Sequence, residues 1–137
     1  MTTTTAPQTS SFSSEVITPL FLGLNLAAFL ALGAIGFFGP YFLAGQLDIT
    51  LGSTSALADF RAMYGGLPLG IAGIIALGMK NAALRHPAVL LSTLTAGGLA
   101  LGRLFTMATV GLPGPLVLVS LASEVLAVGC GLYLLKK

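Results

Sequence analysis

The chain has 137 residues, of which 55% are hydrophobic and only 7% are charged, whereas about a quarter of the residues in soluble domains carry a charge. Together with a mean hydropathy of +0.99, this composition excludes an ordinary soluble domain and predicts a polytopic membrane protein. The net charge of +2 comes from so few ionisable groups that it gives no support to nucleic-acid binding, which needs clustered basic side chains.

The chain begins with a Thr- and Ser-rich stretch, residues 1–14, which we expect to be a disordered tail. The apolar segment that follows predicts a helix over residues 16–38, because Pro19 is tolerated in a first helical turn and Gly39-Pro40 ends the run. Since no basic residue precedes this segment, we expect it to be retained as a signal-anchor helix.

Three further segments reach the roughly 20 apolar residues that a membrane-spanning helix needs: residues 58–79, 87–108 and 115–135. The predicted fold class is therefore all-α, with four transmembrane helices in an up-down bundle that makes up residues 15–137. The connection between the first two helices is too apolar for a solvated loop and too short to span. We expect it to lie along the membrane interface, anchored by Tyr41 and Phe42.

Basic residues predict the orientation. Lys80, Arg85 and His86 lie in the tight connection between the second and third helices, and Lys136 and Lys137 end the chain, whereas the two opposite connections contain no Lys or Arg. This asymmetry places both termini in the cytoplasm. The lone histidine, His86, is interpreted as a solvated loop residue in preference to a ligand of a pigment metal or a proton carrier.

The remaining ionisable groups lie in the other half of the membrane. Asp59 and Arg61 open the second helix, while Arg103 and Glu124 lie about 9 and 14 Å from the same surface at 1.5 Å per residue. Their charges sum to zero, as expected if they pair within the bundle. We expect Glu124 to pair with Arg103, with Arg61 joining or exchanging; the alternative for Arg61 is that its side chain extends to the headgroups. Asp59 would interact with the positive end of its own helix.

Small-xxx-small faces predict where the helices meet. The second helix carries such a face at Gly66 and Gly70, and the third at Gly98 and Gly102. The two glycine pairs would lie at similar depth in the membrane. We therefore expect these two helices to cross there. Pro68 leaves the carbonyl of Tyr64 without its helical donor, and we hypothesise that Arg103 contacts that carbonyl region.

These residues resemble a known family. The pattern is an acid two residues before Arg-Ala-x-Tyr-Gly-Gly, a Gly-Arg pair in the third helix and a lone Glu in the fourth: Asp59, Arg61, Tyr64, Gly65, Gly66, Gly102, Arg103 and Glu124. The chain is similar, from about Val16 to Leu135, to small bacterial membrane proteins described as domain of unknown function 4345. The resemblance implies a four-helix architecture and no established reaction.

Three function classes remain. The favoured one is a non-catalytic accessory subunit that packs against a larger respiratory or photosynthetic complex in a bacterial inner membrane or another energy-transducing membrane. The alternative is a protein that binds a lipid, quinone, pigment or other hydrophobic ligand through the polar cluster of Asp59, Arg61, Tyr64, Arg103 and Glu124. An oligomeric transporter ranks third.

The sequence identifies no catalytic residue, metal site or cofactor. Cys130 stands alone in an apolar stretch and is interpreted as a small buried hydrophobe. The expected partners are membrane lipid and either a larger membrane complex or further copies of the chain, and not nucleic acid.

Overall fold

The computed structural model describes residues 10–137, and this part of the chain is helical with no strand. Its elements follow one another in the order α1 (Ser10–Phe38), α2 (Pro40–Gln46), α3 (Thr54–Arg61), the π-helix η1 (Ala62–Gly66), α4 (Leu67–Lys80), α5 (Ala82–Thr109) and α6 (Pro115–Leu135). Four stretches are long and apolar enough to cross a membrane: Glu15–Phe38, Thr54–Lys80, Ala82–Thr109 and Pro115–Leu135. The chain is therefore an all-α integral membrane protein with four membrane-length helices, as predicted.

The predicted N-terminal tail lies partly outside the described residues, which exclude positions 1–9. Residues 10–14 belong to α1, so the helix begins earlier than the composition of this stretch suggested.

Side-chain caps explain two helix starts that lie earlier than predicted. The side chain of Ser53 accepts a hydrogen bond from the amide of Ala56 at 3.1 Å, so α3 begins four residues before the predicted start. Asn81 Oδ1 accepts from the amide of Ala83 at 3.0 Å and starts α5 well before Pro87. The turn between α4 and α5 is therefore a single residue, and Arg85 and His86 lie in a helix instead of the predicted loop.

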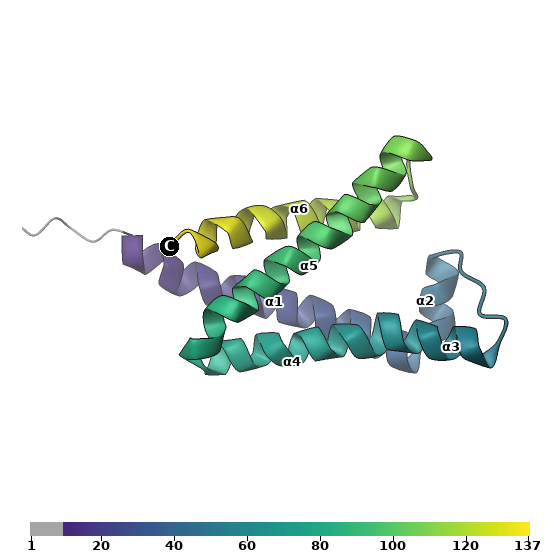
Figure 1. Cartoon of the computed structure of the whole chain (residues 1–137), viewed down its shortest axis with the longest axis horizontal. Helices are drawn as coiled ribbons and strands as arrows, with labels where there is room; N and C mark the ends of the chain where they lie inside the picture. The colour runs from purple at the N-terminus through teal and green to yellow at the C-terminus, as the bar shows by residue number, and fades with distance from the viewer. Residues whose placement is uncertain (1–9) are drawn as a thin grey trace, which may run out of the picture.

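The helices form two pairs that separate toward one end (Figure 1). α1 packs against α4 and η1, α5 packs against α6, and α4 and α5 join the two pairs. Among the described helices, α4 and α6 do not pack against each other. We call the end with the α4–α5 turn the closed end, and the end with the connections 39–53 and 110–114 the open end.

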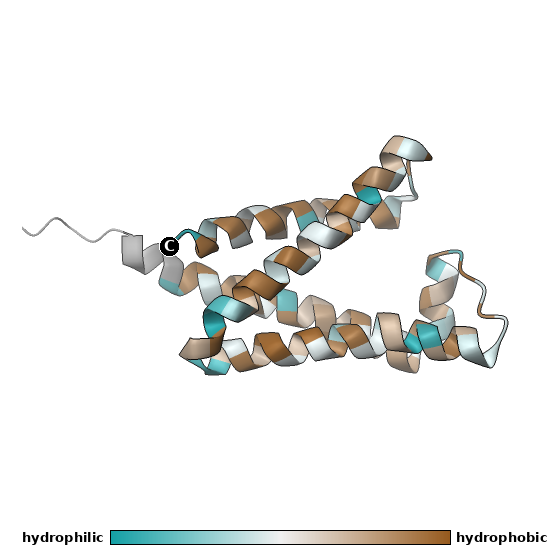
Figure 2. Cartoon of the chain, viewed as in Figure 1, coloured by the Kyte–Doolittle hydropathy of each residue, from teal (hydrophilic) through white to brown (hydrophobic). Residues whose placement is uncertain are grey.

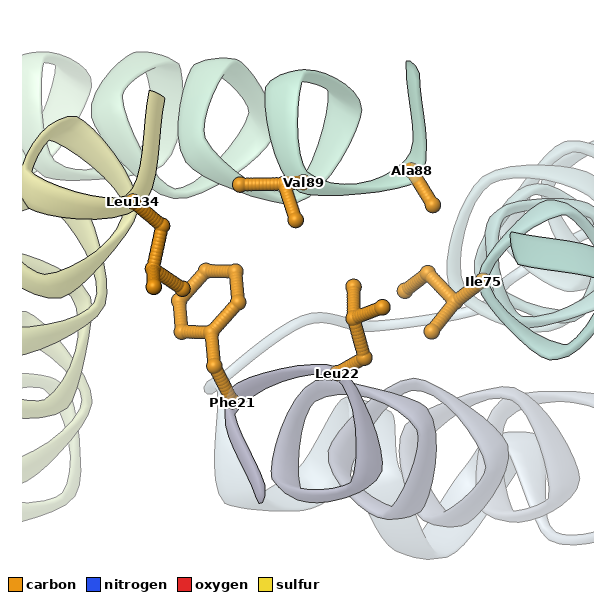
Figure 3. Close-up of a cluster of buried hydrophobic side chains, with 6 residues drawn as sticks. All are labelled: Phe21, Leu22, Ile75, Ala88, Val89 and Leu134. Atoms are coloured by element: carbon orange, nitrogen blue, oxygen red, sulfur yellow. The ribbon is translucent and has the colours of Figure 1, made fainter. Parts of the chain in front are cut away.

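A core cluster at the closed end holds the pairs together, with side chains from all four long helices (Figure 3): Phe21, Leu22, Ile75, Ala88, Val89 and Leu134. Burial elsewhere is low, because at most 33% of the most apolar window of any span is buried. Figure 2 shows apolar residues along the outer surfaces of the helices as well. These outer faces are suited to contact with lipid or other transmembrane helices.

Glycines permit the closest helix contacts, but not the ones predicted. A Cβ atom on Gly36 would collide with the backbone of Tyr64, and one on Gly65 would lie 2.9 Å from the amide nitrogen of Phe37. These positions bring α1 against η1. Near the closed end, Gly78 of α4 meets Ala88 of α5 in the same way.

The predicted crossing of the second and third helices at their glycine pairs is not observed. No atom beyond their own helical backbone lies within 4 Å of a Cβ built on Gly70, Gly98 or Gly102, and Gly66 approaches only the carbonyl of Arg61. The crossing is absent because α4 and α5 meet near the closed end and diverge toward the open end (Figure 1).

Candidate functional site

An ion pair joins α5 to α6 in the part of the bundle nearer the open end. Arg103 Nη1 donates to Glu124 Oε1, and the two side chains are 28% and 11% exposed. Helical side chains lean toward the N-terminus of their own helix, so Arg103 leans toward the closed end and the antiparallel Glu124 leans toward the open end. The two charged groups therefore meet although their Cα atoms differ in depth, and the structure contains the predicted pair.

The second carboxylate oxygen of Glu124 has a different environment. Glu124 Oε2 is buried and has no hydrogen-bond partner in the described part of the chain. An unpaired buried acceptor costs about 1–3 kcal/mol. A proton on this oxygen, or a hydrogen bond from an additional donor, would therefore stabilise the site.

A groove of about 440 Å³ runs beside the ion pair along α5 toward the start of α6. We call it the Arg103 groove, and its lining consists of Gly98, Leu99, Gly102, Arg103, Thr106, Pro113 and Val117. Its wall is mostly apolar, with one guanidinium and one hydroxyl. Glu124 is not part of the lining, so the groove faces the cation of the pair and not its anion.

Arg61 does not join this pair. Its Nε donates to the carbonyl oxygen of Phe37 at 3.2 Å, at the C-terminal end of α1. The last carbonyls of a helix lack intrahelical donors and carry partial negative charge, which makes a cation favourable there. The prediction that Arg61 exchanges with Arg103 is therefore not supported by the structure, and Arg61 instead ties η1 to the end of α1.

Asp59 is also placed differently from the prediction. Because α3 begins at Thr54, Asp59 lies beyond the first helical turn. It is therefore too far along the helix for the predicted interaction with the positive N-terminal end. Its side chain is exposed, and no hydrogen bond or ion pair connects it to another described residue. Asp59 is thus separate from the Arg103–Glu124 pair.

Tyr64 lies in the π-helix, which ends at Gly66, two residues before Pro68. The amide of Leu67 donates to the carbonyl of Ala62, five residues back, and Pro68 then has no amide to donate. The carbonyl of Tyr64 lies against Gly36 of α1, so the hypothesised contact with Arg103 is not observed. The Tyr64 ring stacks on Phe60, with centroids 4.4 Å apart.

A family model described as "Domain of unknown function (DUF4345)" matches residues 17–135. The chain belongs to this family. No curated protein and no solved structure matches it. The match confirms the family that the sequence pattern indicated. The description of the family assigns no reaction to the ion pair or the groove.

Other side chains with reactive groups in this DUF4345 protein lie apart from the groove. Within residues 10–137, no group of three or more His, Cys, Asp and Glu side chains could hold a metal ion. His86 is exposed near the closed end, and Cys130 is a free, half-buried thiol beside the core cluster.

Several positions of structural importance were missed by the sequence analysis. Gly33 places α1 against Leu69 of α4, Gly36 places it against η1, and the carbonyl of Phe37 binds Arg61. The spacing of the two glycines in the first helix was a usable signal. Pro113 and Val117 of the groove gave no signal, because they meet α5 only after α6 turns back.

Proposed function

We propose that this chain is a small non-catalytic accessory subunit that packs against a larger membrane complex of respiratory or photosynthetic type. The observation that supports the proposal is an uncovered glycine face that runs from the last residue of η1 along α4, which we call the α4 face and define by Gly66, Gly70 and Gly73. These residues are exposed, and nothing lies within 4 Å of a Cβ built on Gly70 or Gly73.

The physical reason is the way helices associate in lipid. Lipid tails are as apolar as leucine, so helix association depends on close packing, which glycine permits. A helical glycine costs about 1 kcal/mol relative to alanine. Gly36, Gly65 and Gly78 offset this cost through contacts within the chain. The α4 face has no such contact among the described residues, and a transmembrane helix of a partner would provide it.

The same proposal includes an orientation. Lys80 of α4, Arg85 of α5 and Lys136, which directly follows α6, lie near the closed end. Under the positive-inside rule this end faces the cytoplasm, so both termini lie on that side of a bacterial inner membrane or another energy-transducing membrane.

The test is purification from the native membrane in gentle detergent, followed by mass spectrometry of everything that accompanies the chain. A stoichiometric partner protein is expected, and Gly70→Leu should release it while the bundle stays folded. Gly129→Leu is the matched control, because Gly129 is also an exposed helical glycine with nothing within 4 Å. Recovery of the chain without any protein partner would refute the accessory role.

A second candidate function is binding of a hydrophobic ligand with a polar head. One specific observation favours it. The Arg103 groove has a volume of about 440 Å³ and a mostly apolar lining that includes a partly exposed guanidinium. This volume falls within the range of roughly 300–1,000 Å³ that is usual for ligand sites. A chain with this function would retain its ligand after isolation.

A further inference from the structure

We propose that the Arg103 groove binds one acidic phospholipid, with the phosphate on Arg103 and an acyl chain along Gly98 and Gly102. The inference rests on the second candidate function and names its ligand class. It does not depend on the accessory role, because the α4 face belongs to the other helix pair.

The one charged side chain that lines the groove is the cation Arg103. Arg103 uses Nη1 for Glu124, and no other hydrogen bond of its guanidinium to a described residue is present. A guanidinium has five N–H donors, so the remaining ones are available to a phosphate, which accepts them in a bidentate arrangement. Glu124 does not line the groove, so an anion bound there would contact the guanidinium and not the carboxylate.

The depth of Arg103 suits a headgroup. α5 has 28 residues, so it is about 42 Å long, and it exceeds a hydrocarbon core of about 30 Å by roughly 6 Å at each end. The Cα atom of Arg103 lies six residues before Thr109, or about 9 Å from the helix end. It is thus about 3 Å inside the hydrocarbon boundary. Because the side chain leans toward the closed end to reach Glu124, the lipid phosphate would sit slightly below the headgroup level to meet the guanidinium.

The shape of the groove suits an acyl chain below that headgroup. Gly98 and Gly102 present no side chains, and a Cβ built on either would have nothing within 4 Å. Leu99 and Val117 provide apolar walls. The stretch from Gly98 to Thr106 covers about 12 Å of helix, so the groove continues from the headgroup level into the hydrocarbon region.

A second copy of the chain is a poorer occupant. A two-fold symmetric contact puts the same surface of both subunits together. Two copies docked through this groove would place Arg103 opposite Arg103, and like charges in contact are unfavourable. An acidic phospholipid supplies the opposite charge and an apolar tail in one molecule.

The experiment uses the full chain in nanodiscs with equal amounts of phosphatidylglycerol and phosphatidylcholine, followed by native mass spectrometry after mild release. The wild type should retain one phosphatidylglycerol, enriched roughly tenfold, because the phosphate charge of phosphatidylcholine is offset by its own ammonium group whereas that of phosphatidylglycerol is not. Gly102→Leu fills the groove while both charged residues are kept, and it should abolish the enrichment. Gly129→Leu is the control and should preserve it.

A double variant tests the charge separately. Arg103→Gln combined with Glu124→Gln removes both charges and keeps two partners able to hydrogen-bond, so the bundle should fold and lose the preference for the acidic lipid. Equal retention of the two lipids by the wild type, or unchanged enrichment in Gly102→Leu, would overturn the proposal. A quinone or pigment carried from the native membrane would overturn the lipid class and leave ligand binding standing. A partner helix in the groove, with no bound lipid, would overturn both.

Discussion

Replacement of Glu124 by glutamine measures what the ion pair contributes to the stability of the bundle. The change removes the anion and leaves the Arg103 guanidinium without a counter-charge between α5 and α6. Removing one partner of a buried ion pair costs about 3–5 kcal/mol. Arg103 retains 28% exposure, and its side chain can turn toward the headgroups. We therefore expect a loss of about 2 kcal/mol in the free energy of unfolding.

The assay is reversible unfolding in mild detergent, with helix content followed by circular dichroism. Asp59→Asn is the matched control, because Asp59 is exposed and has no bonded partner among the described residues; its effect should stay within about 0.5 kcal/mol. Arg103→Gln completes a double-mutant cycle, in which the coupling energy should exceed about 1 kcal/mol. A loss below about 0.5 kcal/mol for Glu124→Gln would refute the claim that the pair stabilises the bundle.

Three further predictions use the same unfolding assay. Arg61→Ala removes the hydrogen bond to the Phe37 carbonyl and should cost about 1 kcal/mol; the exposed Arg85→Ala is its control, and equal effects would contradict the assigned contact. Gly36→Ala places a methyl group on the backbone of Tyr64 and should cost about 2 kcal/mol, so an unchanged stability would show that α1 and η1 are not in close contact. Gly70→Ala meets open space and should instead stabilise α4 by up to about 1 kcal/mol; a loss would mean that this face is covered within the chain.

Much of the fold follows from the sequence because the membrane restricts the possibilities. Apolar runs of spanning length have to be helices, since lipid offers no partners for the backbone. The pairing of Arg103 with Glu124 followed from depth alone, because two opposite charges at similar depth on successive helices have few other partners.

The incorrect predictions concern the partner of Arg61 and the contacts of the glycine faces. In both cases several partners are compatible with the local sequence, and the packing of the helices decides between them. Arg61 had donors enough for Glu124, but the end of α1 presents an unpaired carbonyl nearer to it. The glycines of α4 and α5 form genuine small-residue faces, yet a sequence does not show in which direction such a face points. Gly36 and Gly65 carry the internal contact, while Gly70 and Gly102 remain open.

The start of the third helix shows a similar limit at the local level. Pro87 is a plausible first-turn residue, but Asn81 supplies a cap six residues earlier and allows the helix to begin at Ala82. Two signals of comparable strength competed, and the hydrogen bond to the Ala83 amide decided between them.

The most direct test of the accessory role is photo-cross-linking in the native membrane from a photoreactive residue placed at position 70. The proposal predicts a covalent adduct with one distinct membrane protein, and no such adduct from the same residue placed at position 129. Adducts with lipid alone, or with a second copy of the chain, would contradict it.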